Sequence, residues 1–257
     1  MATDRLQLQR FELKYQISEA VALAVRDFVS AYLVLDEFGA GQPQGTYPIH
    51  SLYLDSRHLS QYGDSLNGNK NRFKLRLRFY NNRSDAPVYF EVKRRVNEAI
   101  FKQRAPVRRE AVESLLGGHL PGDNDLVFPE PQTIAALQRF YELMTQVHAQ
   151  PLAHVAYRRE AWVSPTDNSV RVTLDRDVRF EPEMEARLAT QMSNPLRLFR
   201  QKVILEIKFT GRFPDWLREM VRVFDLTQCS AAKYVEGVTL LGEHRLTAMA
   251  GDRLASR

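Results

Sequence analysis

The sequence of 257 residues has a single cysteine, Cys229, so an intrachain disulfide is excluded. A chain with so little cysteine suits a reducing compartment. No stretch approaches the roughly 18 consecutive apolar residues of a transmembrane helix. The N-terminal residues 1–15 also lack the apolar segment of a secretory signal. We therefore expect a cytoplasmic protein without a transmembrane segment, which could still dock on a separate membrane partner.

Common nucleotide-binding and metal-binding motifs are missing as well. The sequence contains no P-loop, no G-x-G-x-x-G, no H-E-x-x-H and no paired cysteines, and its six histidines are scattered. These absences argue against nucleotide binding by those routes and against a zinc-type site. The formal net charge of +5 favours an anionic partner without identifying it. With 44% hydrophobic residues, the chain can build a substantial core.

Hydrophobic periodicity predicts an α+β protein built on a large antiparallel sheet. Amphipathic helices are expected over 19–33, 110–116, 132–147 and 214–225, and a short helix over 234–242 should end the fold. Gly- and Pro-rich residues 37–46 and 117–131 are expected to be loops. Alternating patterns predict eight strands, over 10–17, 48–55, 72–80, 87–95, 98–104, 152–163, 169–180 and 202–209.

Five of these strands share an unusual pattern of charge. Residues two apart on a strand point to the same face. In each strand the apolar positions, such as Leu75 or Ile207, alternate with charged ones. An antiparallel sheet with one solvated face also alternates, but such a face usually mixes Ser, Thr and Gln with charges. Here the polar face is almost wholly charged: Glu12 and Lys14; Lys74, Arg76 and Arg78; Glu91 and Lys93; Arg171, Thr173 and Asp175; Glu206 and Lys208.

A sheet face this rich in cations requires a counterion, because like charges opposite each other destabilise a sheet. Closing the sheet into a barrel would place the charged faces around a wet tunnel and the helices outside. Arginine forks match phosphate oxygens, and lysine adds point charge. Each charge-assisted hydrogen bond contributes roughly 1.5–3 kcal/mol. The pattern therefore predicts a tunnel that holds a phosphate chain.

The few acidic residues on these faces are candidate metal ligands. Glu206 lies two residues before Lys208, and Glu91 two before Lys93. Carboxylates in a basic, phosphate-filled site commonly hold Mg²⁺ or Mn²⁺, which also contacts the phosphates. We favour Glu206 as the metal ligand over Glu91, Glu12 and Asp175. The alternative is that these carboxylates only pair with neighbouring arginine or lysine.

The sequence resembles the VTC domain of polyphosphate polymerases, within the CYTH-like triphosphate tunnel metalloenzymes. One matching stretch alone would be weak evidence, but the set follows the family's order over nearly the whole chain. The stretches are RFELKYQI (10–17), SLYLDSRHLSQY (51–62), KLRLRFY (74–80), YFEVKRR (89–95), YRREAW (157–162), VRVTLDRDV (170–178), LEIKF (205–209) and AAKYVEG (231–237).

The resemblance implies one domain over 1–257, formed by an eight-stranded antiparallel β-barrel, the triphosphate tunnel, with helices packed outside. It implies transfer of the γ-phosphoryl group of ATP to a growing inorganic polyphosphate chain, with Mn²⁺ or Mg²⁺. Glu206 would bind the metal, and Tyr157 would line the nucleotide end. Arg76, Arg78, Arg171 and Lys208 would be catalytic. The phosphate-binding residues would be Lys14, Lys93, Arg159 and Lys233, with Lys102 a looser match.

One departure concerns Ala232, where the family often has serine, so one hydrogen bond to phosphate would be missing. A metal-dependent triphosphatase on the same fold is the main alternative. Relatives with that activity begin with a strand of alternating glutamates, whereas FELKY has only Glu12, which favours the polymerase. A non-catalytic polyphosphate-binding module would bind without turnover. Nucleic-acid binding is disfavoured, because no exposed aromatic platform or recognition helix is evident.

Overall fold

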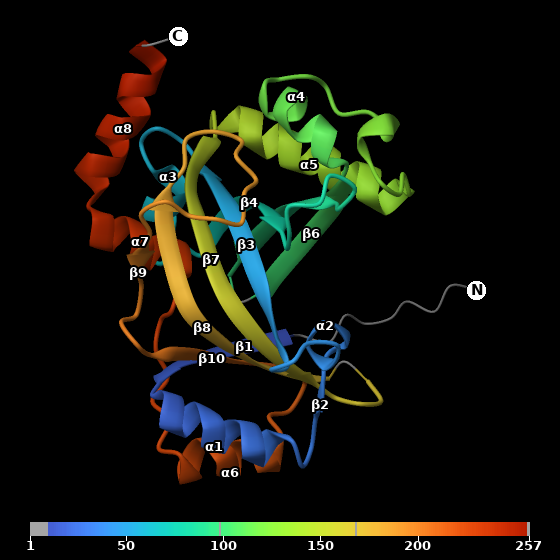
Figure 1. Cartoon of the computed structure of the whole chain (residues 1–257), viewed down its shortest axis with the longest axis vertical. Helices are drawn as coiled ribbons and strands as arrows, with labels where there is room; N and C mark the ends of the chain where they lie inside the picture. Colours follow the sequence, from blue (N-terminus) through green and yellow to red (C-terminus); the bar gives the residue numbers. More distant parts are fainter. Residues whose placement is uncertain (1–9, 98, 168, 256–257) are drawn as a thin grey trace. The chain divides into compact units, whose positions relative to one another are not determined.

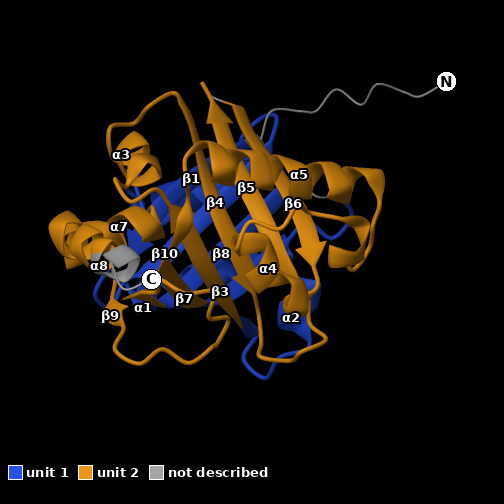
Figure 2. Ribbon diagram, turned by 90° about the horizontal axis from the view of Figure 1, so that it is seen from above, with its two compact units in different colours: residues 1–47, 158–177, 199–231 blue, residues 48–157, 178–198, 232–257 orange. Residues whose placement is uncertain are grey.

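The computed structural model describes residues 10–97, 99–167 and 169–255 (Figure 1). The chain divides into two compact units, each assembled from separate stretches of sequence (Figure 2). The single-domain expectation stays a prediction. Unit 1 takes residues 1–47, 158–177 and 199–231, and unit 2 takes 48–157, 178–198 and 232–257.

Unit 1 is built on β1 (Arg10–Ile17), β10 (Val203–Thr210) and the first part of β8 (Val170–Pro182). β10 pairs antiparallel with both neighbours, so Leu13, Ile207 and Val172 lie in one row across the strands. Helices α1 (Glu19–Val29) and α6 (Asp215–Val223) add further apolar side chains to this core. The Ser18 hydroxyl accepts a hydrogen bond from the Val21 amide, which caps α1 as its sequence predicts.

Unit 2 is built on four strands that pair in chain order. β3 (Thr46–Asp55) pairs with β4 (Asn71–Phe79), β4 with β5 (Val88–Val96), and β5 with β6 (Ala99–Val107), all antiparallel. The first two residues of β3 belong to unit 1. Helix α5 (Pro131–Gln146) covers the apolar side of these strands, where Phe140 meets Phe90 edge to face at 4.8 Å.

The predicted closed barrel of eight strands is wrong. The sheet has ten strands, in the order β1-β10-β8-β7-β3-β4-β5-β6, where β7 is Gln150–Val163. Two short strands, β2 (Val34–Leu35) and β9 (Leu196–Arg197), pair with β7 and β8. Within the described ranges, this order does not return from β6 to β1. Alternation reports which side of a strand is buried, but not whether the first and last strands pair.

Several helices were not predicted. Short α2 (Glu37–Ala40) lies within the expected loop 37–46, and α3 (Ser60–Leu66) follows β3. Residues 110–116 divide into a 3₁₀ turn, Arg109–Ala111, and α4 (Val112–Leu116), and the loop 117–131 contains a second 3₁₀ turn at Asp123–Asp125. The predicted helix over 234–242 is α7 (Lys233–Leu241), but α8 (Glu243–Ala255) follows it, so α7 does not end the fold.

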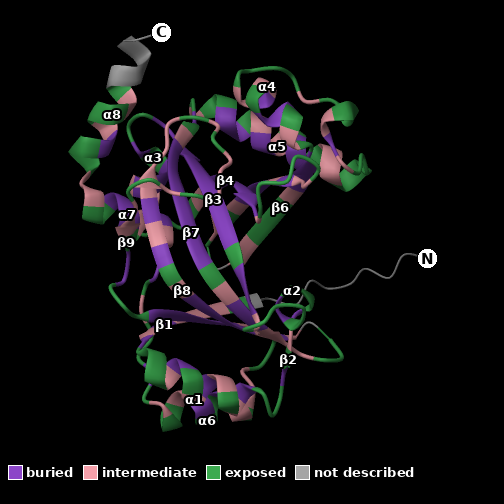
Figure 3. Ribbon diagram, viewed as in Figure 1, coloured by how far each residue is buried: buried purple, intermediate pink, exposed green. Residues whose placement is uncertain are grey.

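Burial confirms the alternation on which the sequence analysis rests (Figure 3). Leu75, Leu77, Val172, Leu174 and Ile207 are all 0% exposed. Several charged side chains on the opposite face of these strands are shielded from solvent as well. Glu91 is only 1% exposed, Asp175 0% and Arg78 7%, so these strands bury ionised groups on their second face as well.

Candidate functional site

A single buried carboxylate, Glu91, is the centre of the charged face of unit 2. Glu91 Oε2 lies 2.7 Å from Arg76 Nη2 and 3.9 Å from Arg78 Nε. Glu91 Oε1 lies 2.9 Å from Lys102 Nζ and 3.2 Å from Arg104 Nε. Four cations thus surround one anion, which leaves this Glu91 cluster with a large positive excess. Glu91 and Arg78 are buried, whereas Lys102 is exposed, and an excess of positive charge that is only partly solvated is stabilised by an anionic ligand.

Strand register explains why these groups meet. Arg76 on β4 lies opposite Glu91 on β5, and Glu91 lies opposite Arg104 on β6. One step along the same face, Lys74, Lys93 and Lys102 form a second row across the three strands. Like charges directly opposite each other repel, and this row places three lysines side by side on the charged face of unit 2.

The electrostatic field of the Glu91 cluster shifts the pKa values of its members. Burial alone would raise the pKa of Glu91, but Arg76 and Arg78 outweigh it and hold this pKa well below the usual range. Desolvation, together with Arg76 and Arg78, lowers the pKa of Lys102 to about 8 despite its pairing with Glu91. Burial would raise the pKa of Tyr53, yet Arg76 and Lys74 lower it to about 8.

Tyr157 joins the Glu91 cluster to the beginning of α7. The Tyr157 hydroxyl accepts a hydrogen bond of 3.3 Å from Arg78 Nη2, and Lys233 Nζ lies 4.7 Å from the centre of the Tyr157 ring. Next to Lys233 in sequence, Tyr234 donates a hydrogen bond of 2.9 Å to the buried carboxylate of Asp55, which fixes the start of α7. The structure therefore brings Arg76, Arg78, Lys102, Tyr157, Lys233 and Glu91 together within unit 2.

Unit 1 has a different charged face, made of a quartet of two lysines and two glutamates. Lys14 Nζ lies 2.7 Å from Glu12 and 3.9 Å from Glu206, whereas Lys208 Nζ lies 2.5 Å from Glu206 and 3.8 Å from Glu12. β1 and β10 pair Glu12 opposite Lys208 and Lys14 opposite Glu206, so the opposite charges alternate around the quartet. Unlike the Glu91 cluster, this group is electrically balanced.

The other predicted cations of unit 1 also have acidic partners. Arg171 Nη2 donates to Asp36 Oδ2 at 2.6 Å, and the Tyr47 hydroxyl donates to the same oxygen at 2.8 Å. Arg159 forms a bidentate ion pair with Asp175, with hydrogen bonds of 2.7 and 2.8 Å. Sequence reasoning expected cations to exceed acids on these faces, but it did not include Asp36, which lies at the start of α2. Unit 2 therefore carries the positive excess.

Arg104, Tyr53, Asp36 and Tyr47 are the site residues that sequence reasoning missed. Arg104 follows Lys102 by two residues, so the alternation that selected Lys102 could have found it. Arg104 lies 3.4 Å from the centre of the Tyr89 ring and donates to the Tyr80 hydroxyl at 3.0 Å. Asp36 has no comparable signal, because its contact with Arg171 spans 135 residues of sequence.

Two histidines of unit 2, His50 and His154, are buried away from its charged face. The rings of His50 and His154 are joined by a contact of 3.1 Å between Nδ1 and Nε2, and Phe79 stacks on His50. Burial lowers the pKa of His50 to about 4 and that of His154 to about 3, so both are neutral at physiological pH. His50 lies on β3 and His154 on β7.

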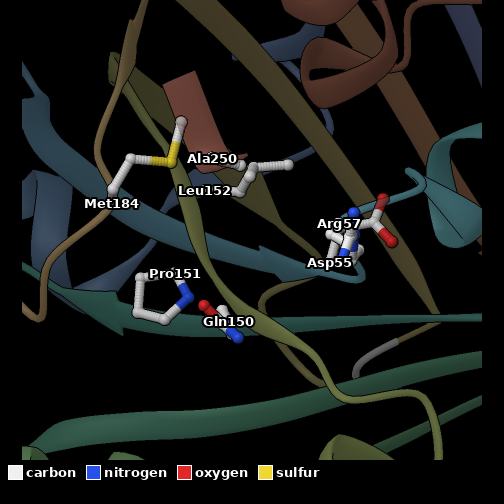
Figure 4. A pocket seen from close by; sticks show the side chains of 7 residues that line it. All are labelled: Asp55, Arg57, Gln150, Pro151, Leu152, Met184 and Ala250. Carbon is white, nitrogen blue, oxygen red and sulfur yellow. The ribbon is translucent and has the colours of Figure 1, made fainter. Parts of the chain in front are cut away.

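Unit 2 also has a small pocket, and none of the seven residues that line it belongs to the Glu91 cluster (Figure 4). Asp55 and Arg57 line one side of it, and Leu152 and Met184 line the other. The Asp55 carboxylate already accepts hydrogen bonds from the amides of Gln61 and Tyr62. Asp55 therefore anchors the start of α3.

The model of the VTC domain family matches residues 9–242 of this chain. The chain belongs to the VTC domain family. The match includes both units and every predicted site residue. In the described part of this VTC domain, no helix combines the length and the apolar character that a membrane crossing requires.

Two curated relatives of this VTC domain are described as vacuolar transporter chaperone complex subunit 2. The Schizosaccharomyces pombe protein is 26% identical over 133 residues, which cover 49% of this chain and 18% of that protein. The Saccharomyces cerevisiae protein is 26% identical over 166 residues, which cover 57% of this chain and 20% of that protein. The chain thus spans about a fifth of the length of the relatives it matches.

Among solved structures, the PH1819 protein of Pyrococcus horikoshii aligns over 91% of this chain and 99% of its own. The identity is 12% and the TM-score is 0.45. The likeness at this level carries no functional conclusion.

Proposed function

We propose that this VTC domain is an ATP-dependent polyphosphate polymerase and that its Glu91 cluster binds phosphate groups. The observation that supports this proposal is the grouping of four cations around one carboxylate, Glu91, that is 1% exposed. Membership of the VTC family supports the same reaction class. The description of the relatives as complex subunits supports a partner protein, to which this chain would dock.

Phosphoryl transfer to a polyphosphate chain makes modest chemical demands on the protein. The attacking terminal phosphate oxygen is already ionised, so no general base is needed. Catalysis then consists of positioning and of neutralising charge on the transferred group. Arg76 and Arg78 would stabilise that group, and Lys93, Lys102 and Lys233 would bind phosphates. In unit 1, Arg171 and Lys208 keep their proposed catalytic roles, and Lys14 and Arg159 their proposed phosphate contacts.

The proposed metal, Mn²⁺ or Mg²⁺, fits Glu206 better than Glu91. In the described part of the chain, no three His, Cys, Asp or Glu side chains form a ready metal site. Glu12 and Glu206 share the same two lysines, so two carboxylates are available side by side. Mg²⁺ is usually held by one or two carboxylates plus substrate phosphates, and when bound it neutralises charge on them. Glu91, with four cations around it, does not fit a divalent cation.

Product sizing tests the proposed reaction. Incubated with ATP and Mn²⁺, the wild-type protein is expected to form long-chain polyphosphate, and Arg76→Ala should lower the rate at least about tenfold by removing a charge-assisted contact. Arg83→Ala is the control, because Arg83 is exposed and its partner is Asp85. If free phosphate or pyrophosphate is the sole phosphate product, the protein is a triphosphatase. Binding without turnover would leave only a polyphosphate-binding module.

Binding of tripolyphosphate should weaken as the pH rises through 8. Lys102 has a pKa of about 8 in the free protein, and a bound polyanion favours its charged form, so binding takes up a proton above that pH. The variant Lys102→Arg stays charged over this pH range. We expect the affinity of the wild-type protein for tripolyphosphate, divided by that of Lys102→Arg, to fall about tenfold between pH 7 and pH 9. Both proteins are titrated calorimetrically with tripolyphosphate, so the ionisation of the ligand itself cancels when their affinities are compared at each pH. Identical pH profiles would contradict a role for Lys102, and Tyr53→Phe tests the other group that titrates near pH 8.

A further inference from the structure

A second group of arginines lies on the opposite side of the strands of unit 1. Arg158 is next to Arg159, and Arg176 is next to Asp175, so by alternation both point away from the charged face described above. With Arg26 of α1 they line an open pocket of about 410 Å³. Its other lining residues are Glu19, Gln44 and Thr46.

Two of the three arginines are held in place by one buried carboxylate, Glu160, which is 1% exposed. Arg26 Nη2 and Arg176 Nη1 bind the same oxygen, Glu160 Oε2, at 2.9 and 2.8 Å. The Trp162 indole donates to the other oxygen at 2.8 Å, which fixes the carboxylate. The two guanidinium groups are therefore neighbours, and their geometry is fixed before any ligand arrives.

Two arginines of this pocket keep hydrogen-bond donors that a ligand could use. Among the residues that the structure describes, Arg158 forms no ion pair, and its Nη2 donates to the Thr46 hydroxyl at 2.8 Å. Arg176 also pairs with Glu19 at 2.8 Å, yet its Nη2 is buried and has no hydrogen-bond partner within the described ranges. A buried guanidinium nitrogen without a partner is costly, so a ligand oxygen that accepts a hydrogen bond from it is favoured at this position.

We infer that this pocket binds a tetrahedral oxyanion of the phosphate class. The three guanidinium groups and the carboxylates of Glu19 and Glu160 leave one positive charge in excess, which suits a small anion rather than a long chain. Arginine forks match the oxygens of such an ion, and the Gln44 amide adds another donor to the lining. Inorganic phosphate and the terminal group of a phosphate ester share this chemistry. The inference does not rest on the proposed function, because none of its residues belongs to the proposed site.

Calorimetric titration at constant ionic strength tests the inference with inorganic phosphate and, separately, with a simple phosphate monoester. Arg158→Ala should weaken binding of the preferred ligand at one site about tenfold, because it removes the cation that has no carboxylate partner. Arg158→Lys should restore part of the affinity by charge alone. Arg218→Ala is the matched control, since Arg218 is an exposed arginine of unit 1 that lies on α6. Arg158 is itself exposed, so its replacement should leave the fold intact.

Two results would overturn the inference. One is that neither ligand binds the wild-type protein beyond the effect of ionic strength. The other is that Arg158→Ala binds as the wild type does, whereas Arg76→Ala loses the binding, which would assign the anion to the Glu91 cluster. If the wild-type protein forms no polyphosphate, yet Arg158→Ala loses a phosphate site that the wild type has, the proposed function fails and the inference stands.

Discussion

Glu91→Gln is expected to lower the free energy of unfolding by about 3 kcal/mol at neutral pH, because it removes the charge of a buried carboxylate from a cluster rich in cations. The substitution keeps the shape of the side chain, but Arg76, Lys102 and Arg104 lose the anion that they contact at 2.7, 2.9 and 3.2 Å. Tripolyphosphate should restore much of the lost stability, because its oxygens supply the missing negative charge. Urea denaturation with and without tripolyphosphate measures both effects.

The pH dependence of this loss follows from the sign of the pKa shift. The pKa of Glu91 is held well below the usual range in the folded protein, so its stabilising contribution is present at neutral pH. That contribution diminishes as the pH falls below the ordinary range of a glutamate, so the wild-type protein and Glu91→Gln should converge in acid. Asp85→Asn is the control: Asp85 and Arg83 form an exposed pair, whose loss should cost less than about 0.5 kcal/mol. Equal losses in the two variants would contradict a special role for the Glu91 cluster.

Gly237→Ala is expected to destabilise the protein by about 3 kcal/mol, near the upper end for overpacking of a core. A Cβ atom at Gly237 would lie 1.9 Å from Cδ2 of Phe180, and Phe180 is itself 0% exposed. Because protein interiors are close-packed, the buried ring could move aside only by displacing its neighbours. Thermal and urea unfolding measure the loss, and Phe180→Leu in the same chain should recover part of it by making space.

Gly63→Ala is the matched control for this steric explanation. Gly63 also lies in a helix, α3, but an added Cβ would meet no atom within 4 Å. Alanine there should stabilise the protein by about 0.5–1 kcal/mol, because it restricts the unfolded chain more than the folded one. If Gly237→Ala were as harmless as Gly63→Ala, the close packing of α7 against Phe180 would be disproved.

Local pattern alone determined much of this protein. The strands at Arg10–Ile17 and Val203–Thr210, and the two-sided alternation through Leu75 and Leu77, could be predicted because side-chain direction in a strand has a period of two. The resemblance to the VTC family could also be recognised from local pattern, because the stretches that carry it are short, charged strand sequences in a fixed order. Helix α5 followed from its apolar stripe, which predicted a helix over 132–147, although Pro131, expected in the loop, is the first residue of the helix.

Tertiary structure alone decided which charges meet. Arg76 and Arg104 are 28 positions apart in sequence, yet strand register places both beside Glu91. Asp36, in a stretch expected to be a loop, neutralises Arg171, and a sequence pattern cannot report a contact made across 135 residues. Likewise, alternation fixed the side of each strand but not the pairing of its edges, which is why the barrel was predicted and the open strand order was found. The residue types set what the site can bind, whereas register and long-range packing set where the positive charge remains in excess.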